Sequence, residues 1–130
     1  MARPLRVVSD FNKTFIASHG RPVAVFEITT RTTQGRFLLK PTRRCRDLVL
    51  GVLGRAQSLL EFELYGYAYL SNHGSLLVGV ESAHQLSKLI CYINSNIARE
   101  LGRKEHSDWQ ETFWGRRARA IPILREEDLT

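Results

Sequence analysis

The fold is decided by residues 62–80, which read FELYGYAYLSNHGSLLVGV. The first half alternates in side-chain character, as a strand with one buried face does. The alternation predicts two faces: Phe62, Leu64, Gly66, Ala68 and Leu70 on one, and Glu63, Tyr65, Tyr67 and Tyr69 on the other. Residues 72–74 predict a tight reversal or a bulge and residues 75–80 a second strand, so the two strands are expected to form a hairpin.

A strand and a helix are predicted before this hairpin. Residues 23–30 (VAVFEITT) are β-branched and aromatic, which indicates a strand, and a turn is expected at 33–35. Thr42 is expected to cap a helix whose apolar stripe consists of Cys45, Leu48, Val49, Val52, Leu53, Ala56, Leu59 and Leu60. Gly51 and Gly54 fall inside this helix, and close packing against a sheet would explain them.

A second helix and a last strand are predicted after the hairpin. Ser82 and Gln85 have the spacing of a capping box, and Gly102 is the expected stop. The buried stripe of this helix is expected to be Leu86, Leu89, Ile90, Ile93, Ile97 and Leu101. A polar loop over 103–111 leads to a strand over 113–124 that is broken or bent at Pro122.

This order of elements predicts an α+β, ferredoxin-like βαββαβ domain, with an antiparallel sheet and both helices on one face. The domain is expected to span residues 23–124. Residues 1–22 are expected to form an N-terminal arm, and residues 125–130 resemble the truncated start of a C-terminal helix.

The charge distribution favours a polyanionic partner. The chain has 130 residues, 43% of them hydrophobic, and a formal charge of +6. Six basic residues and no acidic one lie between Arg31 and Arg46, which fits a nucleic-acid contact. Cys45 and Cys91 are interpreted as small buried hydrophobes in a reducing compartment. No segment has the pattern of a signal peptide or a membrane span, so a cytoplasmic protein is expected.

If both helices cover one face, Tyr65, Tyr67 and Tyr69 are expected to line the open face. Aromatic side chains beside arginines could stack bases and hold phosphates. The alternative is that these rings are cross-strand packing partners or part of a dimer interface.

Four blocks resemble the HUH single-tyrosine transposases, and among these the REP-associated tyrosine transposases: residues 29–39 (TTRTTQGRFLL), 70–73 (LSNH), 92–99 (YINSNIAR) and 113–121 (FWGRRARAI). Together they cover about residues 23–124 in the expected order. The resemblance implies recognition of hairpin-forming single-stranded DNA. It also implies Mg²⁺ or Mn²⁺ held by a His-hydrophobic-His pair on a central strand, and a tyrosine on a later helix that attacks the phosphate.

The sequence departs from this pattern at two places. The His pair maps onto His73 and Ser75, whose spacing places both side chains on the same face of a strand, with Gly74 between them. A neutral hydroxyl is a much poorer metal ligand than imidazole. A glycine here is also expected to loosen the strand. No tyrosine follows Tyr92. His73 is therefore the metal-ligand candidate, Mg²⁺ or Mn²⁺ binding is expected to be weak, and no residue is assigned as catalytic.

The leading hypothesis is a transposase-like domain that binds hairpin or single-stranded DNA and is catalytically impaired. Its phosphate contacts are expected from Arg31, Arg36, Arg43, Arg44, Arg46, Arg116, Arg117 and Arg119. The alternative is an active strand-transfer enzyme whose tyrosine comes from a missing segment or a partner. A third hypothesis is an RNA-binding module, because the RNA recognition motif has the same order of elements. Residues 75–80 of this chain lack the aromatic signature of that motif, which counts against it. A small dimerising domain with a basic edge is the fourth reading, and a homodimer is a further expectation.

Overall fold

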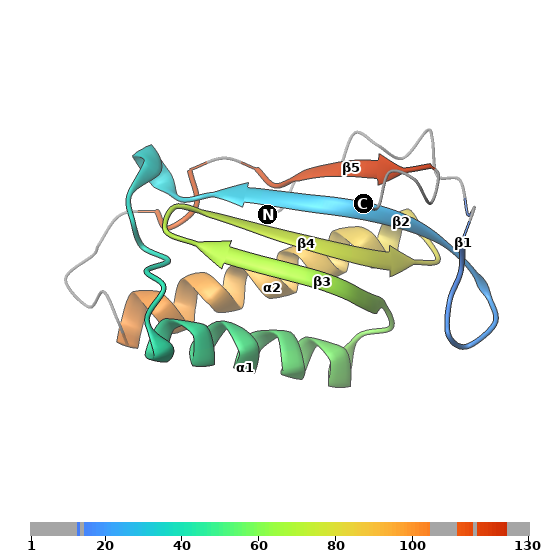
Figure 1. Cartoon of the computed structure of the whole chain (residues 1–130), viewed down its shortest axis with the longest axis horizontal. Helices are drawn as coiled ribbons and strands as arrows, with labels where there is room; N and C mark the ends of the chain where they lie inside the picture. The colour runs from blue at the N-terminus through green and yellow to red at the C-terminus, as the bar shows by residue number, and fades with distance from the viewer. Residues whose placement is uncertain (1–12, 14, 105–111, 116, 125–130) are drawn as a thin grey trace.

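Figure 1 shows the computed structural model of the chain, which describes residues 13, 15–104, 112–115 and 117–124. Its elements, in chain order, are β1 (Phe15–Ile16), β2 (Pro22–Arg31), a 3₁₀ turn (Thr33–Gly35), α1 (Arg43–Leu59), β3 (Glu63–Leu70), β4 (His73–Val80), α2 (Ala83–Lys104) and β5 (Arg119–Ile123). Both helices lie against one face of a single antiparallel sheet (Figure 1). The α+β class is confirmed and is consistent with a ferredoxin-like fold. No helix in the described ranges has the length and apolar character to span a bilayer.

The sheet places β2 and β4 at its centre. β4 pairs with β2 on one side and with β3 on the other, and β5 pairs with the opposite side of β2. Because side chains alternate along a strand, the even-numbered residues of the central strands face the helices. They form the main core with the helix stripes, and the strand members are Ala24, Phe26, Ile28, Leu76, Val78 and Val80.

The start of α1 follows the prediction and its end does not. The Thr42 hydroxyl oxygen accepts a hydrogen bond from the backbone N–H of Cys45 at 3.1 Å, which confirms the cap. Five stripe residues are buried: Cys45, Val49, Val52, Leu53 and Ala56. Leu59 is 67% exposed because it lies in the last turn, beyond the sheet-facing stripe. The packing explanation for Gly54 is wrong, since no atom lies within 4 Å of the place where its Cβ would be.

The second helix is longer than predicted. The Ser82 hydroxyl oxygen accepts from the N–H of Gln85 at 3.1 Å, and Oε1 of Gln85 accepts from the N–H of Glu81 at 2.7 Å. These two bonds confirm a capping box in a form shifted by one residue. Gly102 does not stop the helix, because it is not in the left-handed conformation that such a stop needs. Cys45 is buried as expected, whereas Cys91 is exposed on α2.

A β-bulge in β3 overturns the predicted assignment of its faces. Leu64 pairs with Val78 and Gly66 with Leu77, so Tyr65 is an extra residue on β3. One inserted residue moves every later side chain to the other face. Phe62 and Leu64 pack against the core as predicted, and the prediction is wrong for the residues beyond the bulge. Ala68 lies opposite Ser75 and Leu70 opposite His73, on the open face.

The β3–β4 turn is tighter than predicted. Leu70 pairs with His73, so only Ser71 and Asn72 form the loop, and Ser71 has a φ of 55°. β4 therefore begins at His73 and includes Gly74. A Cβ at Gly74 would overlap the Tyr69 ring, so this glycine packs against an aromatic neighbour in a paired strand.

The first and last strands, β1 and β5, lie near the expected boundaries of the domain. Within the predicted N-terminal arm, β1 pairs with β2, and Ala17 packs with Val23 and Val25 in a second, small apolar cluster. The last strand, predicted over 113–124, is the shorter β5, with Pro122 opposite Phe26. Because β5 is an edge strand, a proline there need not remove a ladder hydrogen bond. Residues 125–130 lie outside the described part of the chain.

Candidate nucleic-acid interface

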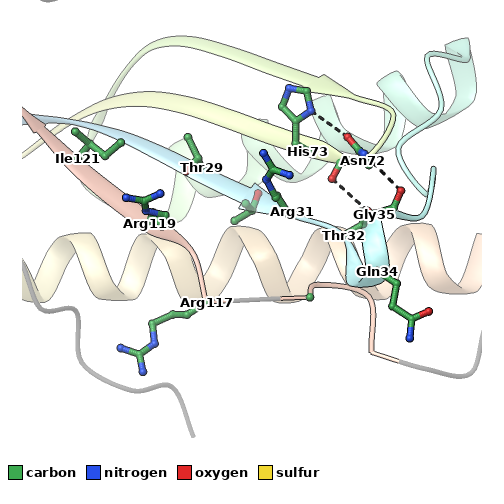
Figure 2. Close-up of a pocket in the computed structure, with 12 residues that line it drawn as sticks. Thr29, Arg31, Thr32, Gln34, Gly35, Asn72, His73, Arg117, Arg119 and Ile121 are labelled. Carbon is green, nitrogen blue, oxygen red and sulfur yellow. Dashed lines mark hydrogen bonds between the residues drawn. The ribbon is translucent and has the colours of Figure 1, made fainter.

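A groove of about 810 Å³ lies where β2 ends and β4 begins. Figure 2 shows that its residues come from β2, the 3₁₀ turn, the β3–β4 turn, the start of β4, the segment that leads into β5, and β5 itself. The lining residues are Thr29, Thr30, Arg31, Thr32, Gln34, Gly35, Asn72, His73, Gly115, Arg117, Arg119 and Ile121. None of them is acidic, so the groove combines three guanidinium groups and an imidazole with neutral walls.

Strand register brings the basic groups together. Arg31 lies directly opposite His73 in the β2–β4 ladder, and Arg119 lies opposite Thr29 in the β2–β5 ladder. All four side chains occupy odd-numbered positions and project from the open face, and Figure 2 shows Arg31 between His73 and Arg119. Directly paired residues have Cβ atoms about 4.5–5.5 Å apart, and diagonal neighbours lie about 7–8 Å apart. Long side chains from all three strands can therefore reach one small ligand.

Thr32 ties the 3₁₀ turn to the β3–β4 turn. Thr32 is 2% exposed, and its hydroxyl oxygen lies 2.5 Å from the carbonyl oxygen of Arg36 and 3.2 Å from that of Asn72, so its one proton is shared between these two acceptors. Its backbone N–H also donates to the Asn72 carbonyl oxygen at 2.9 Å. In return, Nδ2 of Asn72 donates to the carbonyl oxygen of Gly35 at 3.4 Å. These bonds hold the rim of the groove in one conformation, including Gln34 with its φ of 52°.

The segment before β5 closes the opposite wall. The N–H of Gly115 donates to the Arg31 carbonyl oxygen at 2.9 Å, and the N–H of Thr33 donates to the Phe113 carbonyl oxygen at 2.9 Å. A Cβ at Gly115 would lie 2.9 Å from Cα of Thr33, so only glycine fits this approach without a shift. Nε1 of Trp114 donates to the Asn94 carbonyl oxygen at 2.8 Å and anchors the segment to α2.

His73 and Ser75 share the open face, as their spacing predicts. The His73 side chain is exposed, with Nδ1 3.2 Å from Oδ1 of Asn72. The Ser75 hydroxyl donates to Oε2 of Glu27 at 3.3 Å. Among the residues that the structure describes, no three His, Cys, Asp or Glu side chains are grouped closely enough to hold a metal ion.

The eight predicted arginines divide into several groups. Arg31, Arg117 and Arg119 line the groove, whereas Arg36 is exposed just beyond the 3₁₀ turn. Three lie in the first turn of α1, where Arg43 is 4.0 Å from Asp47 and Arg46 lines a smaller groove between α1 and β3. Arg116 lies outside the described residues. The sequence did not single out Thr29 or Gly115, because only the strand register reveals that they line the groove.

None of the four tyrosines lines the groove. Tyr65 is on the open face as predicted, but its ring covers Gly79. Gly79 lies six residues from His73 along β4, or about 20 Å at the rise of an extended strand. Tyr69 packs on the helix side, where burial raises the pKa of its hydroxyl, and Tyr67 lies opposite Leu76 beside α1. Tyr92 lies on α2 and packs against the core.

Comparisons with known proteins identify the fold. No family model matches the sequence, and no curated protein is significantly similar to it. A candidate transposase from Deinococcus radiodurans R1 has a similar structure, with a TM-score of 0.66 and 12% identity over 84% of this chain and 85% of that one. A REP-associated tyrosine transposase bound to a REP hairpin has a TM-score of 0.65 and 13% identity over 99% of this chain. This chain spans 66% of the length of that second protein. The fold is therefore transposase-like.

Proposed function

We propose that this chain is a transposase-like domain that binds hairpin or single-stranded DNA through the groove at the end of β2 and the start of β4. The observation that carries the proposal is that Arg31, Arg117 and Arg119 all line one groove that has no acidic lining residue. Guanidinium groups match the geometry of phosphate oxygens, and the phosphate backbone dominates affinity for DNA.

Two further observations support DNA as the partner. One solved structure with this fold is a transposase in complex with a hairpin, and the present chain aligns over 99% of its length with that protein. His73 and Ser75 also occupy, on central strand β4, the two positions that the HUH resemblance gives to the metal ligands. On that resemblance the groove corresponds to the phosphate-binding site of the HUH enzymes, which supports the proposal.

Binding is proposed here without strand transfer. A phosphotyrosine mechanism needs a tyrosine hydroxyl within hydrogen-bond reach of the scissile phosphate. The four tyrosines of this chain lie on the far end of the sheet, on its helix side or on α2, away from the groove. The alternative is strand transfer with a tyrosine that a missing segment or a partner provides. No contact in the described structure favours this alternative.

Fluorescence anisotropy with labelled DNA tests the proposal. The probes are a hairpin, a scrambled single strand of the same composition, and a duplex of equal length. We expect the hairpin to bind most tightly and the variant Arg31→Gln/Arg119→Gln to weaken it by at least about tenfold, since each lost charge-assisted contact contributes about 1.5–3 kcal/mol.

The matched control is Lys88→Gln, because Lys88 is an exposed cation on α2, in the layer that covers the other face of the sheet. It also lowers the net charge by one and should leave affinity nearly unchanged. Equal affinity for all three DNA probes, or equal losses in the groove and control variants per charge removed, would contradict the proposal.

A further inference from the structure

We propose that the face around His73 binds a phosphate group directly, through Arg31 and Arg119 together with His73, and does so without a divalent metal ion. This inference rests on the proposed function and specifies the chemistry of the same groove. It assigns to two arginines the charge that the family resemblance assigns to a metal.

Arg31 places a positive charge beside His73. Its side chain lies directly opposite His73 on the open face, so a fixed positive charge stands beside the imidazole that would begin a metal site. The described residues include no carboxylate partner for Arg31 or Arg119. A divalent cation at His73 would meet repulsion from these charges, whereas an anion would be attracted by them.

The side chains around His73 offer few ligands for a metal ion. A Mg²⁺ or Mn²⁺ site needs several oxygen or nitrogen ligands with lone pairs directed at one point. The Ser75 hydroxyl at the second expected position donates a hydrogen bond to Oε2 of Glu27, and no group of three or more His, Cys, Asp and Glu side chains that could hold a metal ion lies in the described chain. His73 and the Glu27 carboxylate are thus the protein ligands that this face offers a divalent cation, whereas it offers an anion two guanidinium groups.

Arg31, Arg119 and Thr29 present several hydrogen-bond donors that an oxyanion could accept from. Arg119 lies opposite Thr29, and Thr29 is two residues from Arg31 along β2, so the two arginines are diagonal neighbours. Thr29 carries a hydroxyl between them on the same face. Two forked guanidinium groups and this hydroxyl can surround one phosphate with donors.

The test is a pair of NMR titrations on the full chain in EDTA-containing buffer. Inorganic phosphate is added while the side-chain Nε–H signals of the arginines and the imidazole signals of His73 are followed. We expect saturable shifts at Arg31, Arg119 and His73. The apparent dissociation constant should rise at least about tenfold in Arg31→Gln and stay within about twofold in Lys88→Gln, because only the former loses a charge-assisted contact.

The second titration replaces phosphate by Mn²⁺ in buffer without EDTA. We expect no selective broadening of the His73 signals at concentrations where the phosphate shifts are half complete. Selective broadening at His73, or phosphate shifts that appear only when Mg²⁺ or Mn²⁺ is added, would overturn the inference. Thermal unfolding of Arg31→Gln should match that of the wild type, which shows that the variant is folded.

Hairpin binding in EDTA and in Mg²⁺ separates this inference from the proposed function. Equal affinity in both buffers, lowered by Arg31→Gln, supports both. A hairpin that binds only in Mg²⁺ leaves the proposed function standing and rejects the inference. Phosphate shifts without any hairpin binding reject the proposed function, and the oxyanion site remains.

Discussion

Tyr69 and Gly74 form a cross-strand pair on the helix side of the hairpin. The Tyr69 ring fills the space that a side chain at residue 74 would occupy, so any Cβ there would overlap it. An aromatic ring thus replaces the missing side chain in the packing, and the expectation that Gly74 loosens the strand stays a prediction. The same packing raises the pKa of the Tyr69 hydroxyl through burial.

This shift predicts a loss of stability in alkali. Above pH of about 10, tyrosine ionises in the unfolded chain, while Tyr69 keeps its proton in the folded one. The unfolded state then binds fewer protons, so the free energy of unfolding falls as the pH rises, by up to about 1.4 kcal/mol per unit. Urea denaturation between pH 8 and 11 should show this fall in the wild type and a weaker fall in Tyr69→Phe. Tyr67→Phe, on the same strand but with a ring that is 50% exposed, is the control. Identical profiles for the two variants would contradict the assignment.

At the scale of elements, α1 contains a defect that the fold does not use. Gly54 lies in the middle of the helix on its exposed side, with no atom near the position of its Cβ. Gly115 is the opposite case, since the backbone of the 3₁₀ turn approaches it closely. Close backbone contact therefore explains the glycine at position 115 but not the glycine at position 54, although in the sequence both fall inside a predicted helix or strand.

Gly54→Ala should raise the free energy of unfolding by about 1 kcal/mol, because alanine has the higher helix propensity and nothing obstructs its methyl group. Gly115→Ala should lower the free energy of unfolding, because the new Cβ would meet Cα of Thr33 at 2.9 Å. Urea unfolding of both variants checks the pair. A stabilising Gly115→Ala, or a neutral Gly54→Ala, would show that the packing around these residues differs from the structure.

At the scale of the whole molecule, the open face of the sheet is divided along the strands. One end carries Arg31, His73 and Arg119, and the other carries a small apolar cluster formed by β1 with Val23 and Val25. The basic side chains of the groove therefore lie at one end of this face, away from the apolar cluster. Binding of DNA there should depend on salt through the arginines of the groove and little through cations on the helix layer.

The slope of the logarithm of hairpin affinity against the logarithm of salt concentration measures this division. Each groove arginine replaced by glutamine should reduce the magnitude of the slope by about 0.7 to 0.9, the value per phosphate contact in single-stranded or duplex DNA. Lys88→Gln should leave the slope unchanged. Anisotropy titrations between 50 and 300 mM NaCl, roughly the range in which such contacts are screened, provide the measurement. An equal reduction in Lys88→Gln would place the DNA elsewhere on the molecule.

A homodimer and a cytoplasmic location stay predictions.

The sequence by itself determined the order of the elements from β2 to β5, the two helix caps at Thr42 and Ser82, and most of the buried stripe of α1, because caps and apolar periodicity depend on residues a few positions apart. It also placed His73 and Ser75 on one face, since a strand alternates regularly where it has no bulge. Only the tertiary structure decided which faces Tyr67 and Tyr69 occupy, because the extra residue at Tyr65 is defined by pairing with β4. The groove likewise depends on register between strands distant in the chain: Arg31, His73 and Arg119 become neighbours only when β2 pairs with both β4 and β5.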